Sequence, residues 1–133
     1  MKDLIIAIVV LCCLPLGCAA VSEQTKMKAY EQTMDSYETA MRLSDFNAAC
    51  RYVDSSVMNR NDCLKRYDNL KLVSYDIIGM NLADDKREMT QTVEVEYYFL
   101  DRYIAKKIQY EQSWRYREDE QTWMLRTGPP IFK

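Results

Sequence analysis

The side chains that could do chemistry in this chain are carboxylates and tyrosines, because its 133 residues include no histidine. Without an imidazole, a serine or cysteine nucleophile has no histidine base to activate it, which excludes hydrolases of that class. A carboxylate with a raised pKa and a tyrosine could still act as base and proton donor in an apolar pocket. For such an enzyme we expect Asp76 as the base and Tyr97 or Tyr110 as the donor. These residues lie in no catalytic motif, so the expected class is non-enzymatic.

Metal and phosphate chemistry are disfavoured by the same sequence. Two cysteines in the folded part do not complete a tetrahedral zinc site, so no metal or other cofactor is expected. The three glycines, Gly17, Gly79 and Gly128, are too far apart to form a phosphate-binding loop. The formal net charge is −2 and no basic block stands out, so nucleic acid is not an expected partner.

Two of the five cysteines lie far from the N-terminus, namely Cys50 and Cys63. An even pair in an oxidising compartment indicates a disulfide. The residues between them, 51–62, have the pattern of a helix end, a turn and a new helix, a geometry that can bring the two sulfurs together. We therefore expect a Cys50–Cys63 bond, with two buried free thiols as the alternative.

The N-terminus has the pattern of an export signal. Lys2 precedes an apolar run from Leu4 to Leu16, which is shorter than the roughly 20 apolar residues that span a bilayer. We expect this segment to be recognised and removed. About 115 residues then remain, which is enough for one domain with one core.

The five residues Leu14-Pro15-Leu16-Gly17-Cys18 resemble the lipobox of bacterial lipoproteins. The resemblance implies that residues 1–17 are a signal peptide cleaved before Cys18, which is lipidated and becomes the new N-terminus. Residues 18–26 would then tether the domain to the membrane. Ala19 after the cysteine, rather than Asp, implies the periplasmic side of the outer membrane in a host that has one.

A second processing route stays open. Pro15 stands where the lipobox family favours leucine, and Cys18-Ala19-Ala20 offers the small residues that a general signal peptidase recognises. Cleavage after Ala20 would release a soluble periplasmic protein.

The first half of the mature chain has helical periodicity. Apolar residues recur at alternating steps of three and four, which predicts an amphipathic helix packed on the domain's own sheet: Met27, Tyr30, Met34, Tyr37 and Met41. A second, short helix is expected to begin at Ser44 as N-cap, and a third over residues 58–67.

In the second half, apolar and polar residues alternate with a period of two. This alternation predicts four antiparallel strands around residues 70–77, 92–97, 108–116 and 123–125. Helices followed by strands indicate an α+β fold, with N-terminal helices packed on a curved four-stranded antiparallel sheet. We expect the outer face to carry a charged ladder in which Glu94 and Glu96 face Arg115 and Arg117. Such a charged face favours a monomer.

The order of three helices and four strands, with Trp114 and Trp123 flanking an acidic hairpin, resembles the NTF2-like, cystatin-like cone fold. The resemblance implies that residues 27–133 are one domain, in which a curved sheet wraps a long helix and a pocket can open between them. The candidate lining residues are aromatic, with core packing as the alternative: Tyr97, Phe99, Tyr110, Trp114 and Trp123.

These interpretations together predict a non-enzymatic bacterial cell-envelope lipoprotein. Its NTF2-like domain would be held at the membrane by the lipid and would bind an envelope protein or a small apolar ligand. The alternatives are a soluble periplasmic small-ligand-binding protein and an isomerase-like or dehydratase-like pocket enzyme, since this scaffold hosts many functions.

Overall fold

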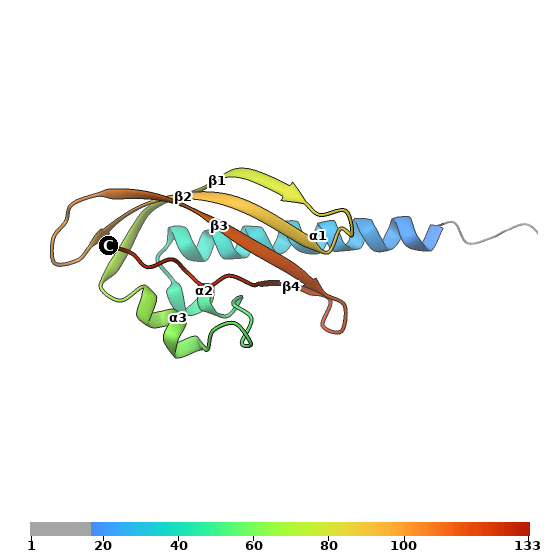
Figure 1. Cartoon of the computed structure of the whole chain (residues 1–133), viewed down its shortest axis with the longest axis horizontal. Coiled ribbons are helices and arrows are strands. Elements are labelled where there is room, and N and C mark those ends of the chain that lie inside the picture. The colour runs from blue at the N-terminus through green and yellow to red at the C-terminus, as the bar shows by residue number, and fades with distance from the viewer. Residues whose placement is uncertain (1–16) are drawn as a thin grey trace, which may run out of the picture.

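The computed structural model describes residues 17–133, and side chains from Glu23 onward (Figure 1). The predicted signal peptide, apart from Gly17, lies outside the described residues, and so does the side chain of Cys18. None of the helices within residues 17–133 is long and apolar enough to cross a membrane.

The chain forms helices first and strands second, as predicted. Figure 1 labels the seven elements, whose bounds are α1 Gly17–Arg42, α2 Phe46–Cys50, α3 Arg60–Arg66, β1 Leu70–Leu82, β2 Glu88–Phe99, β3 Lys106–Arg117 and β4 Thr122–Leu125. The strands form one antiparallel sheet in the order β1-β2-β3-β4. A short parallel bridge between Val53 and Leu125 extends the β4 edge. The predicted α+β class, with a helix packed on a four-stranded antiparallel sheet, is confirmed.

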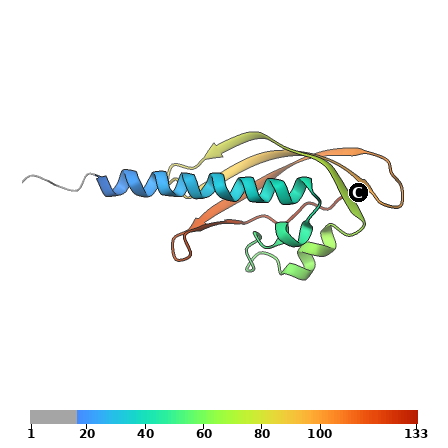
Figure 2. The same ribbon diagram turned by 180° about the vertical axis from the view of Figure 1, so that it is seen from behind.

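Helix α1 lies along one face of the sheet, as Figure 2 shows from behind. Its predicted apolar stripe is the face that packs: Tyr30, Met34, Tyr37 and Met41 are at most 6% exposed, and Met27 packs at the margin of the core. The stripe therefore contributes to the domain's own core, as its spacing predicts.

The segment predicted as a tether, residues 18–26, belongs to α1. Its last residues already contact the rest of the domain, because the Lys26 carbonyl accepts a hydrogen bond of 2.9 Å from Trp123 Nε1 on β4 and Glu23 pairs at 2.9 Å with Lys86 of the β1–β2 loop. The first turns of α1 project beyond the strands in both views (Figures 1 and 2). At 1.5 Å per residue, the five helical steps from Cys18 to Glu23 span about 7.5 Å.

The second helix begins one residue later than predicted. Asp45 caps α2 by accepting from the Ala48 backbone N–H, whereas Ser44 adopts a left-handed φ of 56°. The Ser44 hydroxyl instead accepts a hydrogen bond of 3.0 Å from the Leu72 backbone N–H. The chain reverses at Ser44, so its side chain faces β1 rather than the helix that follows.

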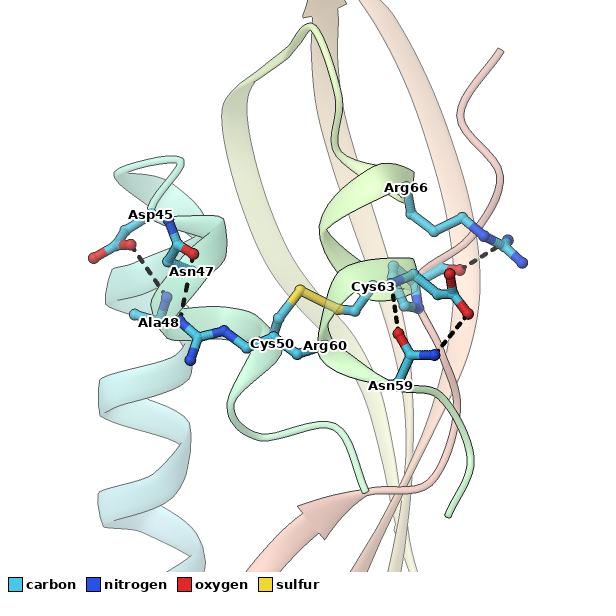
Figure 3. The surroundings of a disulfide bond; sticks show 10 residues. Asp45, Asn47, Ala48, Cys50, Asn59, Arg60, Cys63 and Arg66 are labelled. Carbon is cyan, nitrogen blue, oxygen red and sulfur yellow. Dashed lines mark hydrogen bonds between the residues drawn. A yellow bond between two sulfur atoms is a disulfide. The ribbon is translucent and has the colours of Figure 1, made fainter. Parts of the chain in front are cut away.

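The predicted disulfide is present and joins α2 to α3. Cys50 and Cys63 are bonded, with their Cα atoms 5.9 Å apart (Figure 3). Arg60 adds a second link by donating to the Asn47 side-chain oxygen at 3.4 Å. Asn59 caps α3. Both cysteines are at most 3% exposed, so the bond is part of the core.

The register of β2 and β3 does not form the predicted charged ladder. Glu94 lies opposite Gln109 and Glu96 opposite Lys107, while Arg115 lies opposite Glu88. The loop between Phe99 and Lys106 determines this register. The alternation of inward and outward side chains cannot do so alone, because it is preserved whenever the pairing of the two strands shifts by two residues. The alternation itself is as predicted, with Trp114 and Tyr116 buried and Arg115 exposed.

Candidate functional site

Aromatic side chains fill the centre of the space between α1 and the sheet. Tyr37 on α1 meets Trp114 on β3 edge to face, with ring centroids 5.0 Å apart, and Tyr75 on β1 at 5.9 Å. All three are at most 1% exposed. The centre of the domain is therefore a packed core.

A hydrogen-bond network runs through this core. The Gln112 side-chain oxygen accepts from Tyr75 Oη at 3.0 Å and from Trp114 Nε1 at 3.3 Å. The Gln112 amide nitrogen donates to Tyr110 Oη at 3.5 Å. Burial raises the pKa of Tyr37 to about 12 and raises the pKa of Tyr75 and Tyr110 well above the ordinary tyrosine value. These hydroxyls are protonated at neutral pH; within the network the Tyr75 hydroxyl donates and the Tyr110 hydroxyl accepts.

The five aromatic residues predicted as pocket lining are spread along the domain. Trp114 lies at its centre, Trp123 packs on the N-terminal half of α1, and Tyr97 holds the C-terminus by donating to the Lys133 carbonyl at 2.8 Å. Tyr110 is half-buried, at the end of the glutamine network. Phe99 borders a hollow of about 390 Å³ together with Asp101, Arg102 and Lys133.

The candidate catalytic base lies apart from the candidate donors. Asp76 is exposed on β1, opposite Glu94 of β2. Its neighbours Tyr75 and Ile77 are the residues that face α1, so Asp76 projects from the other face of the sheet. Tyr97 and Tyr110 belong to the inward face.

An apolar hollow of about 330 Å³ lies between α1 and β1. Tyr30 and Met34 line it from α1, and Ile77 and Met80 from β1. Glu31, Asp35 and Glu38 also contribute to the lining.

A polar hollow of about 480 Å³ lies near the β4 edge. Its lining is made of one carboxylate, two hydroxyls and three guanidinium groups: Asp54, Ser55, Ser56, Arg115, Arg117 and Arg126. Arg115 and Arg117 come from the outward face of β3, Arg126 follows β4, and the other three residues form a turn beyond α2. We call this set the arginine hollow.

Asp54 holds the arginine hollow together. One of its oxygens accepts from the Ser56 backbone N–H at 2.9 Å and from the Ser56 hydroxyl at 2.8 Å. The other accepts from Arg126 at 2.9 Å. These bonds, those from Ser56 first, lower the pKa of the Asp54 carboxyl, so it is ionised at neutral pH. The Asp54 backbone N–H also donates to the Leu125 carbonyl at 2.9 Å, which joins the turn to β4.

The sequence gives no local signal for the arginine hollow, because its parts are distant along the chain. Asp54 and Arg126 are separated by 72 positions, and neither lies in a local charge cluster. The sequence pattern predicts Arg115 and Arg117 only as members of the charged ladder. Alternation along β3 placed them together on one face, but no sequence signal indicated that Arg126 would join them.

Within residues 17–133, His, Cys, Asp and Glu side chains form no group of three that could hold a metal ion. No protein-family model matches the chain, and no curated protein matches it in sequence.

Proposed function

We propose that this protein is a non-enzymatic bacterial cell-envelope lipoprotein with an NTF2-like interaction domain. The observation that carries the proposal is the packed core, because Tyr37, Tyr75 and Trp114 occupy the space where a cone fold would hold a substrate. A domain with this interior recognises its partners through its surface.

The geometry of α1 supports the lipid anchor. The helix runs from Gly17 to Arg42 and contacts the sheet from Lys26 onward. A lipid on Cys18 would therefore sit at the end of a short helical arm, with the domain beside the membrane. In a host with two membranes we propose the periplasmic side of the outer membrane.

The NTF2-like fold and the monomeric state are parts of the same proposal. A long N-terminal helix against a four-stranded antiparallel sheet is the arrangement that the cone fold requires. The outer face of β2 and β3 carries Glu94, Glu96, Lys107 and Arg115. A face this charged disfavours a dimer that packs sheet against sheet.

The test is the mass of the protein extracted from its own host. We expect a chain that begins with an acylated Cys18 and carries one disulfide. Cys18→Ser should move the protein from the membrane fraction to the soluble fraction, while Cys12→Ser, in the same signal, should leave it in the membrane fraction. An unmodified chain that begins at Val21 would contradict the lipoprotein and favour the soluble periplasmic protein.

The apolar hollow between α1 and β1 favours a second candidate function. Its volume of about 330 Å³ lies at the lower end of the range of small-ligand pockets. A soluble periplasmic protein that binds a small apolar molecule there would carry that molecule into native mass spectrometry. Met80→Asp should abolish the additional mass, and Val73→Asp, elsewhere on β1, should not.

A further inference from the structure

The arginine hollow combines more positive than negative groups in a protein whose formal net charge is −2. Three guanidinium groups line it against one carboxylate. The carboxylate is Asp54, whose side chain is only 7% exposed and whose two oxygens are both engaged by Ser56 and Arg126. The negative charge of Asp54 is therefore taken up by residues that line the hollow, and a ligand would meet mainly the positive charge of the arginines.

Two groups of the arginine hollow have no partner within residues 17–133. The guanidinium of Arg115 makes no hydrogen bond or ion pair there, although Glu88 lies opposite it in the register. The Glu88 carboxylate accepts from the Ser113 hydroxyl at 2.9 Å. The hydroxyl of Ser55 is exposed and likewise unpaired among the described residues. Both remain available as donors to a ligand.

The other two arginines are held in place by ion pairs with carboxylates. Arg126 is bound to Asp54, yet its side chain is 43% exposed. Arg117 pairs with Asp119 at 3.2 Å and with Glu120 at 3.7 Å, and its side chain is 38% exposed. A guanidinium has five N–H donors, so each of these arginines retains donors beyond those that its carboxylate partners use, one partner for Arg126 and two for Arg117.

We propose that the arginine hollow binds a phosphate group. Several guanidinium forks and a hydroxyl around one hollow match an oxyanion with three or four acceptor oxygens better than a carboxylate with two. The proposal goes beyond the proposed function, because it assigns a ligand to the domain and holds whether or not Cys18 carries a lipid.

The phosphate could come from a lipid headgroup or from a soluble molecule. The turn after Arg117 lies beside α1, since Glu118 pairs with Lys26 at 3.4 Å. Eight residues of helix, about 12 Å, separate Lys26 from Cys18. With a lipid on Cys18 the arginine hollow would lie at the membrane-facing end of the domain, within reach of headgroup phosphates.

The test is a titration of the processed protein with inorganic phosphate at constant ionic strength, followed by the NMR signals of the arginine Nε–H groups and of the Ser55 amide. We expect saturable shifts at Arg115, Arg126 and Ser55, with a dissociation constant in the millimolar range. Arg115→Gln should raise that constant about tenfold or more, because it removes charge-assisted hydrogen bonds. Arg115 is unpaired, so the variant should fold.

The matched control is Arg102→Gln, which removes the same charge in the loop between β2 and β3 and should change the constant less than about twofold. Vesicles of phosphatidylglycerol, compared with phosphatidylcholine, distinguish the two sources. Binding to phosphatidylglycerol that is lost in Arg115→Gln indicates a headgroup ligand, and phosphate binding without vesicle binding indicates a soluble one. The absence of saturable shifts, or an equal loss in both variants, would overturn the proposal.

Discussion

At the scale of single residues, a pair of buried glutamines shows how the contribution of a polar side chain to stability depends on its hydrogen-bond partners. Gln91 on β2 and Gln112 on β3 lie directly opposite each other, and both are at most 2% exposed. Gln112 accepts from Tyr75 and Trp114. The Gln91 side-chain oxygen has no partner among the described residues, and its amide donates only to the Met34 sulfur, at 3.2 Å.

The same substitution should therefore have opposite effects at these two positions. Gln91→Leu removes an unpaired acceptor and should raise the free energy of unfolding by about 1 kcal/mol, whereas Gln112→Leu leaves two buried donors unpaired and should lower it by about 2 to 4 kcal/mol. Urea unfolding with an unchanged m-value would measure both. A loss of stability in Gln91→Leu equal to that in Gln112→Leu would contradict this account.

The ionised carboxyl of Asp54 makes the stability depend on acid pH. Because hydrogen bonds from Ser56 and then Arg126 lower its pKa in the folded state, its contribution is complete above the unfolded value of about 4 and is lost as the pH falls below it. Asp54→Asn should lower stability at neutral pH by about 1 to 2 kcal/mol. It should also flatten the decline below pH 4, measured by urea unfolding across pH. An equally steep decline in both proteins would refute this role.

At the scale of elements, the clearest dependence is that of α2 and α3 on their disulfide. These helices have five and seven residues, and helices this short are not stable alone. Asp45 and Asn59 cap them, and the Cys50–Cys63 bond joins them in the core. Their position therefore depends on tertiary links rather than on helix propensity.

Breaking this bond should cost about 3 kcal/mol, because the unfolded chain regains the freedom of the closed loop. The measurement is denaturant unfolding of the oxidised protein, the reduced protein and Cys50→Ala/Cys63→Ala. If reduction left the unfolding midpoint unchanged, the bond would have no stabilising role.

At the scale of the whole molecule, the core is a single unit rich in tyrosine. Burial raises the pKa of Tyr30 and Tyr37 to about 12 and that of Tyr67, Tyr75 and Tyr110 further in the same direction. Each hydroxyl favours folding while it is protonated. That contribution is complete below the unfolded pKa of about 10 and is lost as the pH rises toward the folded values.

We therefore expect alkaline unfolding to be cooperative. Between about pH 10 and 12, the tyrosinate absorbance of the buried residues should rise together with the loss of near-ultraviolet circular dichroism. Tyr75→Phe, which removes one buried hydroxyl, should make the alkaline transition shallower. Ionisation of all tyrosines near pH 10, with the fold intact, would contradict the burial of these hydroxyls.

Local patterns determined much of this protein. The spacing from Met27 to Met41 predicted the buried face of α1, the alternation around Trp114 predicted the faces of β3, and the Cys50–Cys63 pair predicted the bond between two helices. Each of these depends on periodicity or on the chemistry of neighbouring residues. Such signals are available in the sequence, because helix and strand geometry repeats over a few residues.

Only the tertiary structure decided what the long-range pairings would be. Residues 18–26 belong to α1 and are joined to the rest of the domain by contacts of Glu23 with the β1–β2 loop and of Lys26 with β4. The charge partners of β2 depend on a register determined by the loop before β3. The arginine hollow depends on Asp54 meeting Arg126, 72 positions away. The physical reason is that such contacts are determined by how packed elements are placed, and periodicity within one element contains no information about that placement.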